Sequence, residues 1–328
     1  MAPLQDLLAA ANKEFADATN NGPYSSYQGI QLLLGVARKS VHDLVRDPKG
    51  TFAALNLDLI TRVCGSGHPA LQQTWNGDVG RCTDFALRIA DRLTRRFPDD
   101  FQFEHFHISR PNKQGHRLSR CAKTGIVVDI LSDIGVFTLW EKETKIITTD
   151  HTVSWKLLND KLSITYRGGV EEVFERVSQV EAQAQELHDV ARFVPLVVHF
   201  RDFDLFHSDE FDIFFADIPG SFNVGSQTGP LRFPRGIVKW NLQNKQLTLR
   251  PDVNTSERSI ISWHETHTEQ DARGARLEFA YFVAEYGGPY AEMQWKAGHV
   301  DGFFYQIWKA CDAAFGKPKV IRSVMGSH

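Results

Sequence analysis

The sequence predicts an α+β protein with a group of N-terminal helices, a mixed central region and a β-rich C-terminal extension. Apolar residues recur with helical spacing through most of the first 63 positions. A strongly amphipathic segment at 82–97 is followed by stretches in which apolar and polar side chains alternate, as they do in strands. From position 193 onward the pattern is mostly that of strands, with a further helix near the end.

Composition bounds the class of protein before any motif is considered. The chain has 328 residues, 42% of them hydrophobic, which is enough to bury a core as one large domain or two smaller ones. A net charge of −3 excludes the strongly basic surface of a dedicated nucleic-acid-coating protein, although it leaves room for a local basic groove. The 23 phenylalanines and 7 tryptophans suit a thick core or an apolar ligand pocket.

Targeting signals and cysteine usage predict a cytoplasmic location. The N-terminal residues show no basic segment followed by a long apolar stretch, and no window is apolar enough for a membrane span. The four cysteines are scattered without a CxxC pair, so reduced thiols are expected: Cys64, Cys82, Cys121 and Cys311.

The periodicity assigns individual elements. Helices are expected over 4–18, 27–45 and 51–63, with a turn at 47–50, and over 82–97, 170–191 and 300–315. Strands are expected at 101–107, in a hairpin at 116–131, and at 137–139, 145–149, 162–166, 194–200, 211–215, 236–240, 246–250, 259–264 and 277–284. The predicted divisions are an N-terminal helical segment at 1–50, a core at 51–168, an aromatic-rich extension at 169–325 and a tag-like remnant at 326–328.

The helix predicted at 82–97 begins at a cysteine. A helix N-terminus offers unpaired N–H groups and about half a positive charge, and both favour a thiolate at Cys82. The same N–H groups could stabilise an oxyanion that develops beside the sulfur. Cys82 is therefore a candidate nucleophile.

A base and an orienting carboxylate follow in the predicted hairpin. If 122–125 form the turn and Cys121 pairs with Ile126, then Asp129 lies diagonally from His116 on the same face of the sheet. A shift of register by one residue would place Asp129 on the opposite face. The spacing permits a His116–Asp129 dyad beside Cys82.

These segments resemble the transglutaminase-like, papain-like superfamily, which includes arylamine N-acetyltransferases. The residues that carry the resemblance are Gly80-Arg-Cys-Thr-Asp-Phe, Gly115-His-Arg-Leu-Ser-Arg-Cys and Thr124-Gly-Ile-Val-Val-Asp129, within about 75–135. The resemblance implies a nucleophile-bearing helix packed on an antiparallel sheet, with Cys82, His116 and Asp129 as a catalytic triad for acyl transfer. The chain departs from the family pattern at Arg117, at Ile130 and in lacking a second glycine beside Cys82, which leaves the substrate class open.

The expected function is cysteine-dependent acyl transfer through a thioester, by an amide-forming transferase or cyclase or by a hydrolase acting on a small substrate. The donor could be a CoA, carrier-protein or aminoacyl ester; nucleic acid is expected only as an aminoacyl carrier, and no cofactor is expected. Candidate substrate-binding residues are Gln73, Trp75, His107 and Trp263. At most two of four aromatic residues are expected to face Cys82: Phe222, Trp240, Trp263 and Tyr286.

Other interpretations remain open. Cys82 lies on the apolar stripe of its helix and could be a core thiol in a non-catalytic protein of the same fold that holds a hydrophobic ligand. A zinc site could combine Cys64, His68 and Cys82 with His105 or His107, although the spacing matches no standard ligand pair. The sequence His264-Glu-Thr-His267 has the wrong spacing for a metalloprotease motif.

Overall fold

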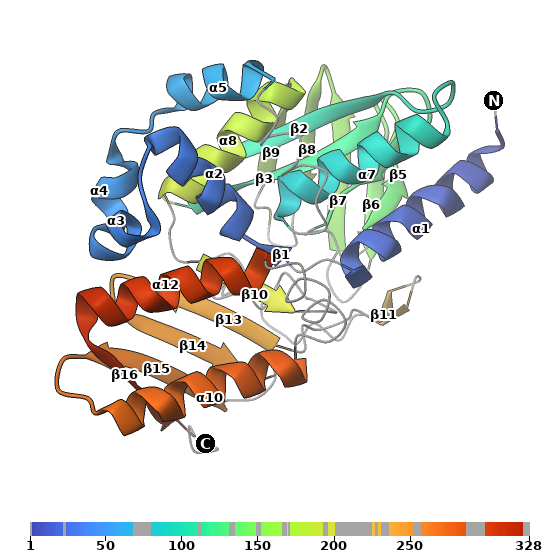
Figure 1. Cartoon of the computed structure of the whole chain (residues 1–328). Coiled ribbons are helices and arrows are strands. Elements are labelled where there is room, and N and C mark those ends of the chain that lie inside the picture. Colours follow the sequence, from blue (N-terminus) through green and yellow to red (C-terminus); the bar gives the residue numbers. More distant parts are fainter. Residues whose placement is uncertain are drawn as a thin grey trace.

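The computed structural model describes residues 2–21, 24–67, 80–110, 113–130, 135–148, 152–165, 169, 171–192, 196–200, 225–226, 229–230, 236–251, 257–286 and 299–323. These residues form two antiparallel sheets of eight and six strands, a two-stranded ribbon and the helices around them (Figure 1). The ribbon pairs β11 (Gly225–Ser226) with β12 (Gly229–Pro230). The predicted α+β class is confirmed.

The N-terminal helices are shorter and more numerous than the apolar periodicity predicts. They are α1 (Leu4–Asn21), α2 (Tyr27–Ala37), α3 (Val41–Arg46), α4 (Pro48–Ala53) and α5 (Leu57–Gly65). The helix expected at 27–45 is interrupted because Arg38 adopts a left-handed conformation and Ser40 caps a new helix together with Asp43. The turn expected at 47–50 instead begins α4, with Asp47 as its N-cap and Pro48 at the first position.

The eight-stranded sheet curls so that its two edge strands approach each other. Its order is β5 (Val136–Thr138), β4 (Ile126–Val128), β3 (Lys113–Cys121), β2 (Phe103–Arg110), β9 (Glu171–Val177), β8 (Lys161–Thr165), β7 (Thr152–Leu158) and β6 (Thr144–Thr148). Lys145 on β6 donates to the backbone oxygen of Thr138 on β5 at 2.9 Å. Phe137 and Trp155 stack edge to face at 4.7 Å in a hydrophobic cluster that also contains Phe174. The curled sheet therefore encloses its own core.

Strand β9 corrects the prediction of one long helix over 170–191. The segment 171–177 pairs with both β2 and β8, and helix α8 (Gln179–Arg192) starts only afterwards. Ser178 and Glu181 exchange hydrogen bonds across the first turn of α8, and this local cap separates the strand from the helix. The division expected at residue 168 consequently lies inside the eight-stranded sheet.

The six-stranded sheet combines β1 from the N-terminal region with strands from the second half of the chain. Its order is β1 (Tyr24–Ser25), β10 (Leu196–Phe200), β13 (Gly236–Asn241), β14 (Gln246–Arg250), β15 (Arg258–His264) and β16 (Lys317–Ser323). Helices α10 (Glu269–Tyr286) and α12 (His299–Phe315) pack with it, as Figure 1 shows in orange and red. Helix α10 replaces the strand expected at 277–284, because Thr268 and Asp271 cap a helix whose buried residues recur every three or four positions. The strand expected at 211–215 lies outside the described residues.

Tryptophans fill the core of this second sheet. Trp240 and Trp263 stack at 5.4 Å, and Trp308 meets Trp263 at 5.2 Å. The indole N–H of Trp263 donates to Asp312 at 2.8 Å. These side chains belong to one hydrophobic cluster, whereas Cys82 belongs to another. Trp240 and Trp263 are therefore core residues of the second sheet and do not line the cysteine site; Tyr286 packs against the same cluster, and Phe222 lies outside the described residues.

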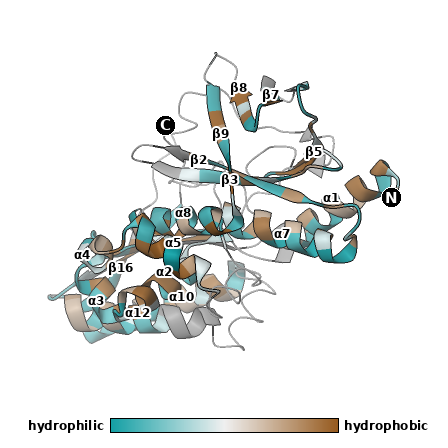
Figure 2. Ribbon diagram, turned by 90° about the horizontal axis from the view of Figure 1, so that it is seen from above, coloured by the Kyte–Doolittle hydropathy of each residue, from teal (hydrophilic) through white to brown (hydrophobic). Residues whose placement is uncertain are grey.

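Helix α7 (Cys82–Arg96) lies across the other sheet as its amphipathic pattern predicts. Phe85, Ile89 and Leu93 are fully buried and share a cluster with Cys121 and Val128 on the strands. Helices α7 and α8 lie along the same side of β2 and β3 (Figure 2). This packing fixes where the N-terminus of α7 lies relative to β3.

Replacing Trp263 tests its assignment to the core. We expect Trp263→Ala to lower the free energy of unfolding by about 3–5 kcal/mol, as other buried tryptophan deletions do. Trp140 is a matched control because 42% of its surface is already exposed, so Trp140→Ala should cost less. Urea unfolding followed by circular dichroism measures both; equal losses for the two variants would contradict the assignment.

Candidate active site

The N-terminus of α7 is held by a short segment of the N-terminal region. The Ser25 amide donates to the Gly80 carbonyl at 2.7 Å, and the Arg81 side chain donates to Ser26 Oγ at 3.0 Å. The Arg81 amide donates to Asp84 Oδ2 at 2.6 Å, which caps the helix. A Cβ atom on Gly80 would lie only 2.2 Å from Asp84 Cβ. Glycine is therefore required at position 80 for the cap to close in front of Cys82.

His116 and Asp129 meet as the predicted hairpin register requires. The strand pairs are Ser119 with Val128 and Arg120 with Val127, which is the register expected from the turn at 122–125. Asp129 follows β4 directly, and its Oδ1 lies 2.7 Å from Nε2 of His116. Both side chains are almost completely buried. The predicted His116–Asp129 contact is confirmed.

Cys82 lies near enough to the imidazole to act on its pKa. Burial lowers the pKa of His116, but the charge of Asp129, its hydrogen bond and the nearby Cys82 together raise that pKa from 6.5 to about 9. With Nε2 occupied by Asp129, the other ring nitrogen is the one available to the thiol. The structure thus brings Cys82 near the His116–Asp129 pair. The Cys82 thiol itself donates to Glu186 Oε2 at 4.0 Å, and Nδ1 of His116 has no hydrogen-bond partner among the described residues.

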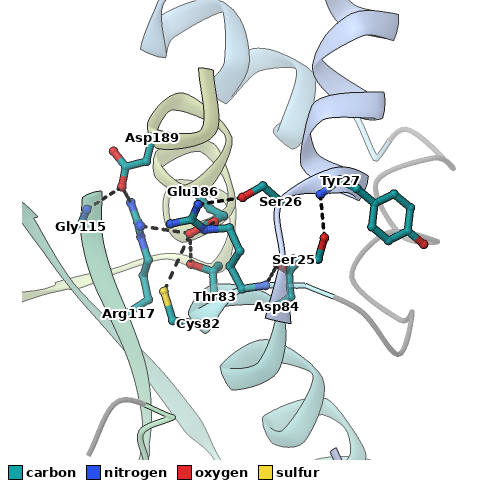
Figure 3. A network of polar contacts seen from close by, with 11 residues as sticks. Ser25, Ser26, Tyr27, Cys82, Thr83, Asp84, Gly115, Arg117, Glu186 and Asp189 are labelled. Atoms are coloured by element: carbon teal, nitrogen blue, oxygen red, sulfur yellow. Dashed lines mark hydrogen bonds and ion pairs between the residues drawn. The ribbon is translucent and has the colours of Figure 1, made fainter. Parts of the chain in front are cut away.

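A second group of charges surrounds the same thiol (Figure 3). Glu186 on α8 pairs with Arg81 at 2.7 Å and with Arg117 at 3.1 Å, and its Oε2 lies 4.0 Å from Cys82 Sγ. Arg117 also pairs with Asp189 at 2.7 Å. Paired buried charges of this kind are costly to break, because removing one partner leaves the other without compensation.

Sequence reasoning missed Glu186 and Asp189 and treated Arg117 only as a departure from a family pattern. The departure has a structural explanation. Arg117 directly follows His116 on β3, so the two side chains leave the strand on opposite faces, and Arg117 reaches both carboxylates of α8. The sequence did contain a signal. Glu186 stands directly before Leu187 and Asp189 directly before Val190, and both apolar residues are buried on this helix. Acidic groups at the edge of a buried stripe need cationic partners.

The remaining predicted site residues are placed differently. His107 pairs directly with Arg117 across β2 and β3, and burial together with the Arg117 charge lowers its pKa. It therefore lies beside the second charge group. Gln73 and Trp75 lie outside the described residues, as does His68. Trp263 lies in the core of the other sheet.

The described residues of the suggested zinc site do not gather around a common point. Cys64 and Cys82 belong to different hydrophobic clusters. No group of three or more histidine, cysteine or acidic side chains that could hold a metal ion occurs within the described ranges. Over the same ranges, no helix combines the length and apolarity needed to cross a bilayer.

Comparison of the chain with protein-family models, curated proteins and solved structures found no match. The transglutaminase-like interpretation consequently rests on the residues and geometry described above.

Asp129→Asn tests the electrostatic coupling in the dyad. A raised pKa means that His116 stabilises the fold fully below pH 6.5 and loses this contribution as the pH rises through about 9. The shift corresponds to about 3 kcal/mol. We expect the stability difference between the wild type and Asp129→Asn to be largest below pH 6.5 and to shrink toward higher pH, as measured by urea unfolding. A pH-independent difference would show that His116 and Asp129 are not coupled.

Proposed function

We propose that the protein catalyses acyl transfer through a thioester on Cys82, in the manner that its resemblance to the transglutaminase-like superfamily implies. The observation that carries this proposal is the 2.7 Å contact between His116 and Asp129, together with the influence of the nearby Cys82 on the pKa of His116. A thiol, an imidazole and a carboxylate in this order provide a nucleophile, a base and a group that orients and stabilises the base.

In the first half of the reaction, the Cys82 proton resides on His116 as a thiolate–imidazolium pair, which the raised pKa of His116 favours, and the thiolate attacks the carbonyl carbon of the donor. Asp129 stabilises the imidazolium that results. The first backbone N–H groups of α7 lie next to the sulfur and are suited to bind the developing oxyanion. His116 then returns the proton to the leaving alcohol or thiol, and the acyl group remains on Cys82 as a thioester.

In the second half, an amine or water attacks the thioester while His116 accepts its proton. The Cys82 thiolate leaves, and the product is an amide or an acid. The expectation of a small substrate was based on aromatic residues of the C-terminal half, and Trp240 and Trp263 no longer support it. We therefore propose acyl transfer in the cytoplasm, with a CoA, carrier-protein or aminoacyl ester as the acyl donor, and assign no size to the acceptor.

An intact-mass experiment tests this proposal. After incubation with acetyl-CoA, an acylated carrier protein or an activated ester, we expect the wild-type mass to increase by one acyl group. The adduct should be lost in Cys82→Ala and retained in Cys121→Ala. Cys121 is a matched control because it is equally buried in the same cluster but contacts backbone groups instead of an imidazole.

A lack of reactivity at Cys82 would contradict the proposal. If no donor acylates Cys82, and iodoacetamide modifies it no faster than Cys121 at neutral pH, Cys82 is a structural thiol. The non-catalytic binding protein then replaces the enzyme as the better interpretation.

A further inference from the structure

Glu186 takes no part in the transfer steps, yet its carboxylate contacts Arg81, Thr83 and Arg117 beside Cys82. Its Oε1 lies 2.7 Å from Nε of Arg81. Its Oε2 accepts from Thr83 Oγ1 at 3.0 Å and from Arg117 at 3.1 Å, and it lies 4.0 Å from the sulfur of Cys82. Figure 3 shows the labelled Thr83, Cys82 and Arg117 converging on this carboxylate.

We propose that Glu186 is a positioning residue that holds Thr83, Arg81 and Arg117 around Cys82, and whose negative charge opposes formation of the Cys82 thiolate. The inference rests on the proposed role of Cys82 as the nucleophile. It adds to that role a control on the pH at which the thiolate forms.

The Glu186 carboxylate joins several secondary-structure elements around Cys82. Glu186 belongs to α8, Thr83 to the first turn of α7 and Arg117 to β3, while Arg81 is the N-cap of α7. The side chains of Glu186, Arg81 and Arg117 are each 2% exposed. One buried carboxylate therefore fixes the helix start that carries the nucleophile relative to the strand that carries the base.

The electrostatic part follows from the charges that face Cys82. Those on β3 are His116 and Arg117, and both favour a thiolate when positively charged. On α8, Glu186 faces the sulfur at 4.0 Å and disfavours a second negative charge. His116 and Arg117 are both paired with carboxylates. Removing the negative charge of Glu186 therefore changes the electrostatic potential at the sulfur most directly.

The charges on α7 and at its start complete the surroundings of Glu186. Burial and the charge of Glu186 raise the pKa of Asp84 to about 8, whereas the Arg81 amide, Arg88 and the Arg81 side chain lower it. The raised pKa disfavours a negative charge on Asp84. Glu186 and Asp129 then remain as the acidic groups that act on the Cys82–His116 pair, and Asp129 acts through the imidazole.

Glu186→Gln is the direct test, because glutamine keeps the shape and removes the charge. The rate of Cys82 modification by iodoacetamide would be measured across pH by intact mass. We expect the profile to move toward lower pH by about 1–3 units, the shift that a single charge within 4–6 Å produces. A profile that stays in place or moves toward higher pH would overturn the electrostatic part.

Asp189→Asn is the matched control. It also removes one of the two carboxylates paired with Arg117, so it causes a comparable structural loss but leaves the charge of Glu186 in place. We expect its alkylation profile to remain within a few tenths of a pH unit of the wild type. If both variants shift equally, the effect reflects Arg117 or general loosening and the proposal is wrong.

Thr83→Val keeps the proposal testable if Glu186→Gln does not fold. Valine is nearly isosteric with threonine but cannot donate to Glu186, so the carboxylate acts on the sulfur with less compensation. We expect a shift of the alkylation profile in the opposite direction, toward higher pH. A shift toward lower pH, or none, would contradict the proposal.

These measurements need no acyl donor, so the two proposals fail separately. If Cys82 forms no acyl adduct but Glu186→Gln still shifts the alkylation profile, the proposed function fails and the role of Glu186 stands. If an adduct forms while the profile does not move, Cys82 is a nucleophile that Glu186 does not control.

Discussion

The arrangement around Cys82 depends on one constraint: charges that are buried must be paired. Arg81 and Arg117 are almost completely buried, and the carboxylates of Glu186 and Asp189 compensate them. Because these four residues come from α7, β3 and α8, their pairing determines how the three elements approach one another. Hydrophobic contacts bring α7 onto the sheet, but the charge pairs specify where its first turn comes to rest.

The same network connects the two sheets. Strand β1 is the edge of the six-stranded sheet, and its Ser25 amide binds the Gly80 carbonyl immediately before α7. Helix α8 follows the eight-stranded sheet in the chain and leads into β10 of the other sheet, while its Glu186 holds Arg81. The start of α7 is thus restrained from both sheets. A nucleophile needs such restraint, since small misplacements relative to its base are costly in rate.

Sequence reasoning located the His116–Asp129 contact because its determinants are local. The helix at 82–97 has a clear apolar face, and the turn at 122–125 fixes the register that places Asp129 beside His116. The charge network was missed because its pairs join residues 69 to 105 positions apart, and no pattern within one segment reveals them. Strand β9 was missed for a different reason, since its apolar residues continue the helical spacing of α8 until Ser178 caps the helix.

The second half of the chain shows where composition misleads. Its aromatic residues suit either a ligand pocket or a core, and only tertiary packing distinguishes these outcomes. Trp240, Trp263 and Trp308 contact one another, so they stabilise the second sheet instead of lining a cavity at Cys82. Likewise, 277–284 read as a strand because its aromatic residues are strand formers, but the cap at Thr268 and the spacing of the buried residues impose a helix.

The four cysteines show that the partners of a buried thiol, and not burial itself, decide its chemistry. All four are buried. Burial raises the pKa of Cys64 to about 11 and also raises that of Cys311, which makes both poor nucleophiles at neutral pH. Cys121 contacts the backbone of Asp100 and Gln102. Cys82 differs from the other three because its thiol lies 4.0 Å from an arginine-paired carboxylate and acts on the pKa of a histidine.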